Sequence, residues 1–174
     1  MILVGEVLKE FIEENNVLSS NNFDQTCISL SLGNCIIKMI PNEKCTFLKY
    51  GKKIPEECIK REDISSAGLT LAPHSSVLAM SEEEISMPLG YFGFLQTKGS
   101  LARLMVSLHF SDGQIDPGFK GHVTFEICNA SDFFVHIDYL KAVGNLYIFE
   151  VCGDSKPYNG KYANSTKPTI QVPF

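Results

Sequence analysis

The sequence predicts a mainly β fold, an antiparallel barrel or sandwich preceded by one short helix. Three observations favour this fold class. Apolar residues fall at helical spacing in residues 1–16, later apolar residues alternate with polar ones in short runs, and Gly, Pro, Asn and Ser interrupt these runs roughly every ten residues. The regular alternation of helix and strand signals that a parallel α/β sheet requires is missing from the sequence.

The first element is an expected amphipathic helix within residues 1–16. Its apolar face would hold Val4, Val7, Leu8, Phe11 and Ile12, which recur at helical intervals. The same segment lacks the basic region and the small-residue cleavage site of a secretory signal peptide. We therefore expect a cytoplasmic protein whose six cysteines are reduced and mostly buried thiols.

Short strands are expected after the helix, each recognised by alternation or by β-branched and aromatic residues. Two segments lack such patterns. The charged residues 42–63 are expected to form an exposed insertion or irregular loop, and residues 155–174 a mobile C-terminal segment. The predicted strands are Cys27–Leu32, Asn34–Met39, Gly68–Leu71, Ser76–Met80, Tyr91–Leu95, Leu104–Phe110, His122–Cys128, Phe133–Ile137 and Leu146–Val151.

Composition limits the possible classes of function. The chain has 174 residues, of which 44% are hydrophobic and 20% charged, and this fits a single domain (1–174) with its own core. The net charge of −5 argues against a general binder of nucleic acids or of membrane surfaces. No apolar run approaches the ~18 residues that span a bilayer. A small anionic ligand remains possible, because a few local cations suffice to hold a phosphate group.

Two acids stand in the segment IDPGFKGHVTFEICN, Asp116 before a Pro-Gly turn and Glu126 within a predicted strand. Alternation places Val123, Phe125 and Ile127 toward the core and Glu126 on the opposite face. That face meets either solvent or the wall of a pocket, and the pattern leaves both open. Asp116 also has a purely structural interpretation, because aspartate before Pro-Gly commonly forms turns.

A cationic segment precedes this hairpin, where TKGSLARL contains Lys98, Gly99, Ser100 and Arg103. Glycine permits close approach of the backbone and arginine can bind two phosphate oxygens, so a polyphosphate site is one interpretation. A turn with solvated cations is the other. The order of residues differs from a Walker A loop. The four histidines are scattered and the signature of zinc-dependent nucleobase deaminases is missing, so no metal ligands are predicted.

Six segments carry a resemblance to a known family. They are LSLGN (Leu30–Asn34), LTLAP (Leu69–Pro73), KGSLAR (Lys98–Arg103), IDPGFKGHVTFEICN (Ile115–Asn129), GNLYIFE (Gly144–Glu150) and PYNGKYAN (Pro157–Asn164). In this order and nearly at this spacing, they resemble motifs of the trimeric dCTP deaminase and dUTPase superfamily. The deaminase branch is the more similar, and the resemblance covers nearly the whole chain.

The resemblance implies a distorted β-barrel or jelly-roll of the dUTPase-like type, assembled as a homotrimer with active sites between subunits. It also implies hydrolytic deamination of dCTP to dUTP and ammonia without zinc. Glu126 matches the glutamate that activates water, and Arg103 matches an arginine that holds substrate and water. Residues 155–174 would form a lid over a nucleotide whose triphosphate carries Mg²⁺. Nucleotide-binding positions match or adjoin Lys98, Gly99, Ser100, Asp116, Tyr158 and Lys161.

Two other functions stay open. Asp116 matches an aspartate that supports the sugar and the hydrolytic water in the dUTPase branch. A dUTP diphosphatase, or a bifunctional deaminase that proceeds to dUMP, is therefore the first alternative. Lys98, Gly99 and Ser29 replace an arginine, a serine and an aspartate of the family pattern. A non-catalytic, nucleotide-binding trimer is therefore the second alternative.

Overall fold

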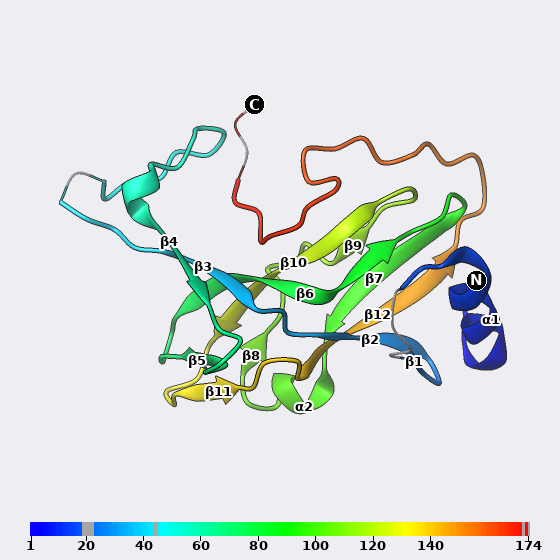
Figure 1. Cartoon of the computed structure of the whole chain (residues 1–174), viewed down its shortest axis with the longest axis horizontal. Helices are drawn as coiled ribbons and strands as arrows, with labels where there is room; N and C mark the ends of the chain where they lie inside the picture. The colour runs from blue at the N-terminus through cyan, green and yellow to red at the C-terminus, as the bar shows by residue number, and fades with distance from the viewer. Residues whose placement is uncertain (19–22, 44, 172, 174) are drawn as a thin grey trace.

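Two five-stranded sheets make up most of the fold (Figure 1). The computed structural model describes residues 1–18, 23–43, 45–171 and 173. One sheet has the order β1-β2-β12-β7-β9 and the other β4-β3-β6-β10-β8, with β11 and β5 as a separate pair. The predicted mainly β, jelly-roll-like class with a short N-terminal helix is confirmed. The described elements are α1 (Gly5–Asn15), β1 (Phe23–Asp24), β2 (Cys27–Ser31), β3 (Cys35–Met39), η1 (Glu56–Cys58), β4 (Ile59–Asp63), β5 (Leu69–Leu71), β6 (Ser76–Ser86), β7 (Tyr91–Thr97), α2 (Gly99–Ala102), β8 (Val106–Ser107), β9 (Gln114–Ile115), β10 (Lys120–Asn129), β11 (Val135–Ile137) and β12 (Ala142–Glu150).

The core lies between the two large sheets, because their strands alternate buried and outward side chains. Phe125 and Ile127 of β10 are fully buried from one sheet, and Leu146 and Ile148 of β12 from the other, all in one hydrophobic cluster. Burying each such side chain contributes ~1.5–3 kcal/mol. This packing fixes β10, so the outward residues of the strand keep defined positions.

The helix α1 buries only part of its predicted apolar face. Leu8, Phe11 and Ile12 are buried, but Val4 precedes the helix and Val7 is 59% exposed. The prediction for Val4 and Val7 is wrong, because a helix that starts at Gly5 turns a narrow stripe toward the sheets and leaves Val7 at its edge. Among the described helices, none is long and apolar enough to cross a membrane.

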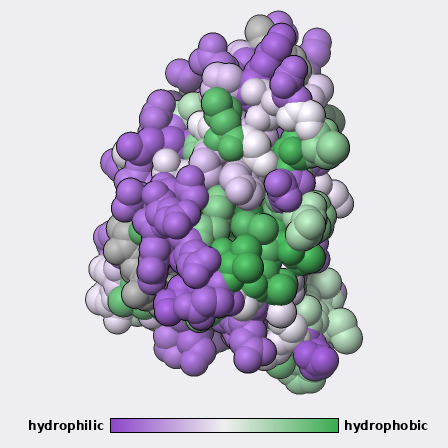
Figure 2. All heavy atoms as spheres, turned by 90° about the vertical axis from the view of Figure 1, so that its right-hand side faces the viewer, coloured by the Kyte–Doolittle hydropathy of each residue, from purple (hydrophilic) through white to green (hydrophobic). Residues whose placement is uncertain are grey.

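The segment before α1 runs along β12. Ile2 pairs with Phe149, and the N–H of Leu3 donates to the carbonyl of Ile148 at 2.9 Å. Figure 2 looks at the side of the molecule that carries α1 and shows an apolar cluster bordered by hydrophilic residues. Met1 and Ile2 are exposed at this end of the chain. The N-terminal segment is thus held against the sheet by its backbone.

The strand β6 runs beyond the predicted end at Met80 and continues to Ser86. Its second half contains the acidic sequence SEEE, which the predicted strand did not include. Glu83 fits inside the strand because its buried carboxylate accepts the backbone N–H of Ser31 at 2.8 Å. A buried charge is tolerated where hydrogen bonds satisfy it, and the sequence alone does not show such a partner.

Other strand boundaries also differ from prediction. The predicted strand Leu104–Phe110 is reduced to β8, because the chain turns at Met105, whose φ is 60°. The predicted strand Phe133–Ile137 begins at Val135, and β12 begins earlier than predicted, at Ala142. The two-residue strands β1 and β9 were missed, because so short a strand shows no alternation.

Residues 40–43 and 45–58 project from the sheet between β3 and β4 and form what we call the arm (Figure 1). The insertion predicted at residues 42–63 is confirmed only in part, because Ile59–Asp63 is the strand β4, paired with β3. Lys38 of β3 and Lys60 of β4 both bind the carboxylate of Glu62, at 2.7 and 2.8 Å. Opposite charges on one face allow this polar segment to join the sheet.

Residues 155–171, which we call the tail, return from the end of β12 toward β10 (Figure 1). The N–H of His122 donates to the carbonyl of Ser165 at 2.9 Å. Near the end of the tail, the side-chain amide of Gln171 donates to the carbonyl of Lys52 in the arm at 2.9 Å. The tail therefore connects β10 with the arm. Its mobility as a lid stays a prediction.

All six cysteines are free thiols in the structure. Only Cys27 and Cys58 are buried, so the expectation of mostly buried thiols is wrong. The other four lie on outward strand positions, in the arm, or after β12. A small, weakly polar thiol is tolerated at such partly exposed positions.

Candidate active site

A cavity of about 690 Å³ opens beside β10. Its walls come from outward residues of β10, from the turn at residues 112–116, from the arm and from the tail. The arm and the tail are joined across it, because Gln171 donates to the carbonyls of Lys49 and Lys52 at 3.5 and 2.9 Å. The volume lies within the ~300–1,000 Å³ that small-molecule sites usually have.

Glu126 lies on the outward face of β10 and on the wall of this cavity. Its Oε2 accepts a hydrogen bond from the N–H of Phe110 at 3.4 Å. Burial raises the pKa of the Glu126 carboxyl to about 7; the negative charge of Asp112 adds to this increase, and the bond from Phe110 opposes it. The sequence pattern left open whether this face of β10 meets solvent or the wall of a pocket, and the structure shows the wall of a pocket. A carboxyl with this pKa can both accept and release a proton near neutrality.

The turn after Asp116 forms a second wall, and both Asp116 and Tyr158 line the cavity. The N–H of Phe119 donates to the carbonyl of Asp116 at 3.1 Å, and Gly118 has a φ of +79°. A Cβ at Gly118 would also lie 2.9 Å from the Cα of Pro157. Glycine is therefore required by the turn and by the approach of the tail, which brings Tyr158 to the cavity.

The cationic segment lies elsewhere. Lys98 precedes α2, Gly99 and Ser100 are exposed within it, and Arg103 follows it. None of these four described residues lines the cavity that contains Glu126. Nη1 of Arg103 donates to the carbonyl of Gly99 at 3.0 Å, and a Cβ at Gly99 would come within 3.1 Å of that nitrogen. A single chain therefore does not bring the predicted catalytic pair, Glu126 and Arg103, into one cavity.

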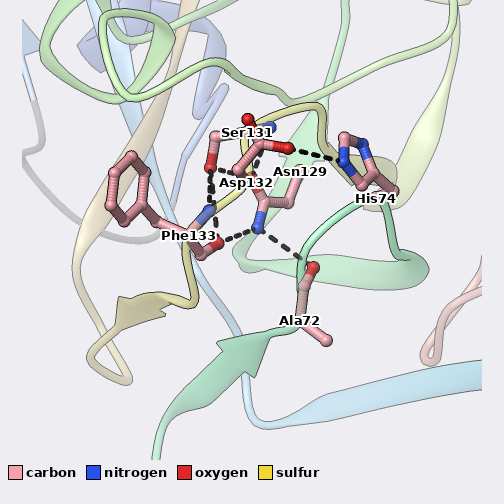
Figure 3. A network of polar contacts seen from close by, with 6 residues as sticks. All are labelled: Ala72, His74, Asn129, Ser131, Asp132 and Phe133. Carbon is pink, nitrogen blue, oxygen red and sulfur yellow. Dashed lines mark hydrogen bonds and ion pairs between the residues drawn. The ribbon is translucent and has the colours of Figure 1, made fainter.

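Arg103 lines a second cavity, of about 410 Å³, beside an exposed apolar loop. Phe133 and Phe134 in this loop are 76% and 73% exposed. The loop is held by the buried Asn129, whose Nδ2 donates to the carbonyls of Phe133 and Ala72 at 2.8 and 3.0 Å (Figure 3). Two adjacent, exposed phenylalanines beside an arginine form the kind of surface that binds another protein.

Lys161 lies in the tail, and its Nζ donates to the carbonyl of Pro173 at 2.7 Å; it does not line the cavity. Within the described ranges, no three His, Cys, Asp or Glu side chains gather as metal ligands. Asp112 and Asp116, whose side chains carry carboxylate oxygens, nevertheless line the cavity. Such hard oxygen donors suit Mg²⁺, which commonly arrives bound to nucleotide phosphates. The residues present therefore fit the predicted magnesium nucleotide.

Several parts of the cavity wall were missed by sequence reasoning. His122 shares the outward face of β10 with Glu126, and the period-two pattern that placed Thr124 on this face could have identified His122 as well. Tyr50 in the arm and Gln171 in the tail also line the cavity. No signal in the sequence pointed to these two, because irregular segments have no periodicity from which a direction can be read.

Comparisons with known proteins identify a family and individual relatives of this chain. A family model described as dCTP deaminase-like matches residues 2–150. A protein of Methanoculleus marisnigri named "dCTP deaminase, dUMP-forming" is 32% identical, over 98% of this chain and 94% of its own. A protein of the same name from Corynebacterium kroppenstedtii is 36% identical, over 60% of this chain and 59% of its own.

A solved structure shares the fold. The 2′-deoxycytidine 5′-triphosphate deaminase from Agrobacterium tumefaciens superposes with a TM-score of 0.64 over 84% of this chain, at 15% sequence identity. The match covers 47% of that protein, so this chain corresponds to about half of its length. At such low identity the likeness concerns the fold, whereas the family model and the M. marisnigri protein match along the sequence. The chain therefore belongs to the dCTP deaminase-like family.

Proposed function

We propose that the protein deaminates dCTP and then cleaves the phosphate chain, so that it releases ammonia, diphosphate and dUMP. The observation that carries this proposal is the position of two acids, Glu126 and Asp116, on the walls of one cavity. The names of the relatives from M. marisnigri and C. kroppenstedtii support a dUMP-forming reaction. From the sequence alone we expected dUTP as the final product, and we now favour the bifunctional alternative.

Glu126 performs the deamination as a general acid and base. Its carboxylate takes a proton from water, and the oxygen attacks C4 of the cytosine ring. The same carboxyl group passes protons to N3 and to the departing amino group, so that dCTP and water give dUTP and ammonia. The pKa near 7 supports both directions of proton transfer. This step needs no zinc, in keeping with the missing zinc-deaminase signature in the sequence.

Asp116 serves the second reaction. As a carboxylate on the wall of the same cavity, it holds the sugar and orients the water that attacks the phosphate chain. The dUTP formed first and a second water then give dUMP and diphosphate. Asp112 and Asp116 would be oxygen donors on this wall for Mg²⁺ bound to the triphosphate, and the ion would neutralise part of the phosphate charge.

A neighbouring copy completes the site in a homotrimer. Of the described residues that line the cavity, only Lys49 is a lysine or an arginine, which is little positive charge for a triphosphate. The exposed segment at α2 carries the missing cations, Lys98 and Arg103. We therefore place this segment of one subunit at the cavity of the next. The exposed Phe133 and Phe134 beside Arg103 form part of the contact.

The nucleotide is held by groups from both subunits. Arg103 of the neighbour holds substrate and water, and Lys98, Gly99 and Ser100 bind the triphosphate with side chains and backbone N–H groups. Tyr158 and Lys161 bind the same phosphates from the tail. The tail already lies along β10 and is joined to the arm, so it excludes water from the bound nucleotide when it closes.

The test is a paired assay. The protein is incubated with Mg²⁺ and either dCTP or dUTP, and ammonia and diphosphate are measured separately. We expect both products from dCTP. Ammonia without diphosphate would reduce the activity to a dCTP deaminase, and diphosphate from dUTP without ammonia from dCTP would identify a dUTP diphosphatase.

No product from either nucleotide, with binding of both retained, would support a non-catalytic trimer instead. That result would have a structural reason. Gly99 offers no hydroxyl group, and Arg103 is bonded to the carbonyl of Gly99. Sedimentation of the protein, alone and with nucleotide, would show whether three copies associate.

A further inference from the structure

Three outward residues form a row along β10: His122, Thr124 and Glu126. All three are half-buried and line the cavity, whereas Cys128, the next outward residue beyond Glu126, does not. Along β10, the cavity therefore extends from Glu126 only toward His122. A strand rises ~3.3 Å per residue, so His122 lies roughly 12 Å from Glu126, slightly shortened by the irregularity between His122 and Thr124.

The imidazole of His122 is fixed by a hydrogen bond to the backbone of Ser81. Its Nδ1 lies 2.9 Å from the carbonyl oxygen of Ser81, and the Oγ of Ser81 accepts the N–H of Val123 at 2.8 Å. Ser81 is fully buried, and its Oγ donates to the carbonyl of Glu83 at 2.7 Å. A carbonyl oxygen only accepts hydrogen bonds, so Nδ1 carries the proton. No hydrogen bond to Nε2 occurs among the residues that the structure describes.

A nucleotide whose base lies at Glu126 has its sugar and phosphates toward His122, because the cavity offers no other direction along β10. We propose that Nε2 of His122 binds an oxygen of the phosphate chain, and that the imidazole takes up a proton when the nucleotide binds. This inference rests on the proposed function, since it places the base at Glu126. It adds a phosphate-binding residue that our sequence reasoning did not identify.

The proton follows from the fixed orientation of the ring. With Nδ1 protonated, neutral His122 presents a lone pair at Nε2, which repels a phosphate oxygen. A second proton turns Nε2 into a charged hydrogen-bond donor to the phosphate oxygen. The other titratable groups that face the cavity are Lys49, Tyr50, Asp112, Asp116, Glu126, Tyr158 and Tyr162, with Glu84 opposite His122 on β6.

The experiment is calorimetry in buffers of different ionisation enthalpy, which counts the protons taken up on binding. We would use Glu126→Gln as the background, because it stops turnover and removes the titration of Glu126 itself. At about pH 7.5, this variant should take up close to one proton with dCTP and none with deoxycytidine.

A second substitution, His122→Asn, keeps an amide that can donate to Ser81 but removes Nε2. In the Glu126→Gln background it should abolish proton uptake and weaken dCTP binding about tenfold, while deoxycytidine binds as before. His74→Asn is the matched control, since His74 is exposed and lies outside the cavity. It should change neither quantity.

The possible results distinguish a failure of the role of His122 from a failure of the proposed function. If the Glu126→Gln variant binds dCTP with no proton uptake, or if His122→Asn leaves uptake and affinity unchanged, the role of His122 is wrong while the proposed function stands. If the variant binds no dCTP at all, the proposed function is overturned and this inference with it.

Discussion

The cavity wall on β10 and the cationic segment at α2 were both predicted to belong to one site, yet only the first is in place within a single chain. β10 lies between β6 and β8, and hydrogen bonds along both edges fix the direction of Glu126. α2 is a four-residue helix on the surface, and Arg103 bonds to its own turn at Gly99. A central strand positions a side chain by itself, whereas an exposed turn depends on what binds to it.

The largest effect should come from Glu126→Gln on the β10 side. The amide cannot take a proton from water, so ammonia release from dCTP should fall by at least ~10³-fold. Because glutamine has nearly the same shape, the thermal unfolding midpoint and the binding of dCTP should be close to those of the wild type. Ammonia release at an unchanged rate would remove Glu126 from the mechanism.

The α2 side is tested by Arg103→Ala, alone and together with the Glu126 variant. Each variant should be nearly inactive alone, because each lacks one half of every site. When the two are co-expressed in equal amounts, random trimers contain about one quarter of sites with both groups intact, so about a quarter of the wild-type activity should return. Activity that stays absent in the mixed trimers would show that one chain supplies both residues.

Asp116→Asn should separate the two reactions. Both acids line one cavity, but only Asp116 is assigned to the phosphate chain. Diphosphate release from dUTP should fall ~100-fold, whereas ammonia release from dCTP should stay within about threefold of the wild type. The products are followed by chromatography, and dUTP should accumulate. Equal loss of both products would instead identify Asp116 as a residue that shapes the whole cavity.

The sequence could predict the direction of Glu126, because period-two alternation is a local property of a strand and the neighbouring Phe125 and Ile127 are plainly core residues. It could not predict the raised pKa of Glu126. That shift depends on burial, to which irregular segments far away in the chain contribute, since the arm and the tail line the same cavity. The resemblance to a family supplied the chemical role instead.

The fold shows the same division between local and distant causes. β10 was predicted well because its alternation is regular, and β3 because Ile36 and Ile37 are β-branched residues typical of strands, but the acidic half of β6 was missed. Glu83 is compatible with burial only because Ser31, far away in the sequence, donates to it. Gly118 was predicted as a turn residue. That it must also lack a Cβ, because Pro157 of the tail packs against it, is visible only in the three-dimensional structure.

The smallest expected effect concerns the pH dependence of the β10 side. The pKa of Glu126 is raised to about 7 mainly by burial, with a further increase from the negative charge of Asp112. Since Glu126 acts as a base only when ionised, kcat/KM for deamination should fall as the pH decreases through about 7. Asp112→Asn removes the nearby charge and lowers the pKa of Glu126, so this fall should move to lower pH. The position of the fall is compared, and not the height of the plateau, because Asp112 is also a proposed oxygen donor for Mg²⁺. Asp132→Asn is the control, because Asp132 is 90% exposed and lies outside the cavity. If Asp112→Asn leaves the pH profile unchanged, burial alone sets the proton affinity of Glu126. If the fall moves equally in both variants, its cause is the net charge of the chain and not a charge on the cavity wall.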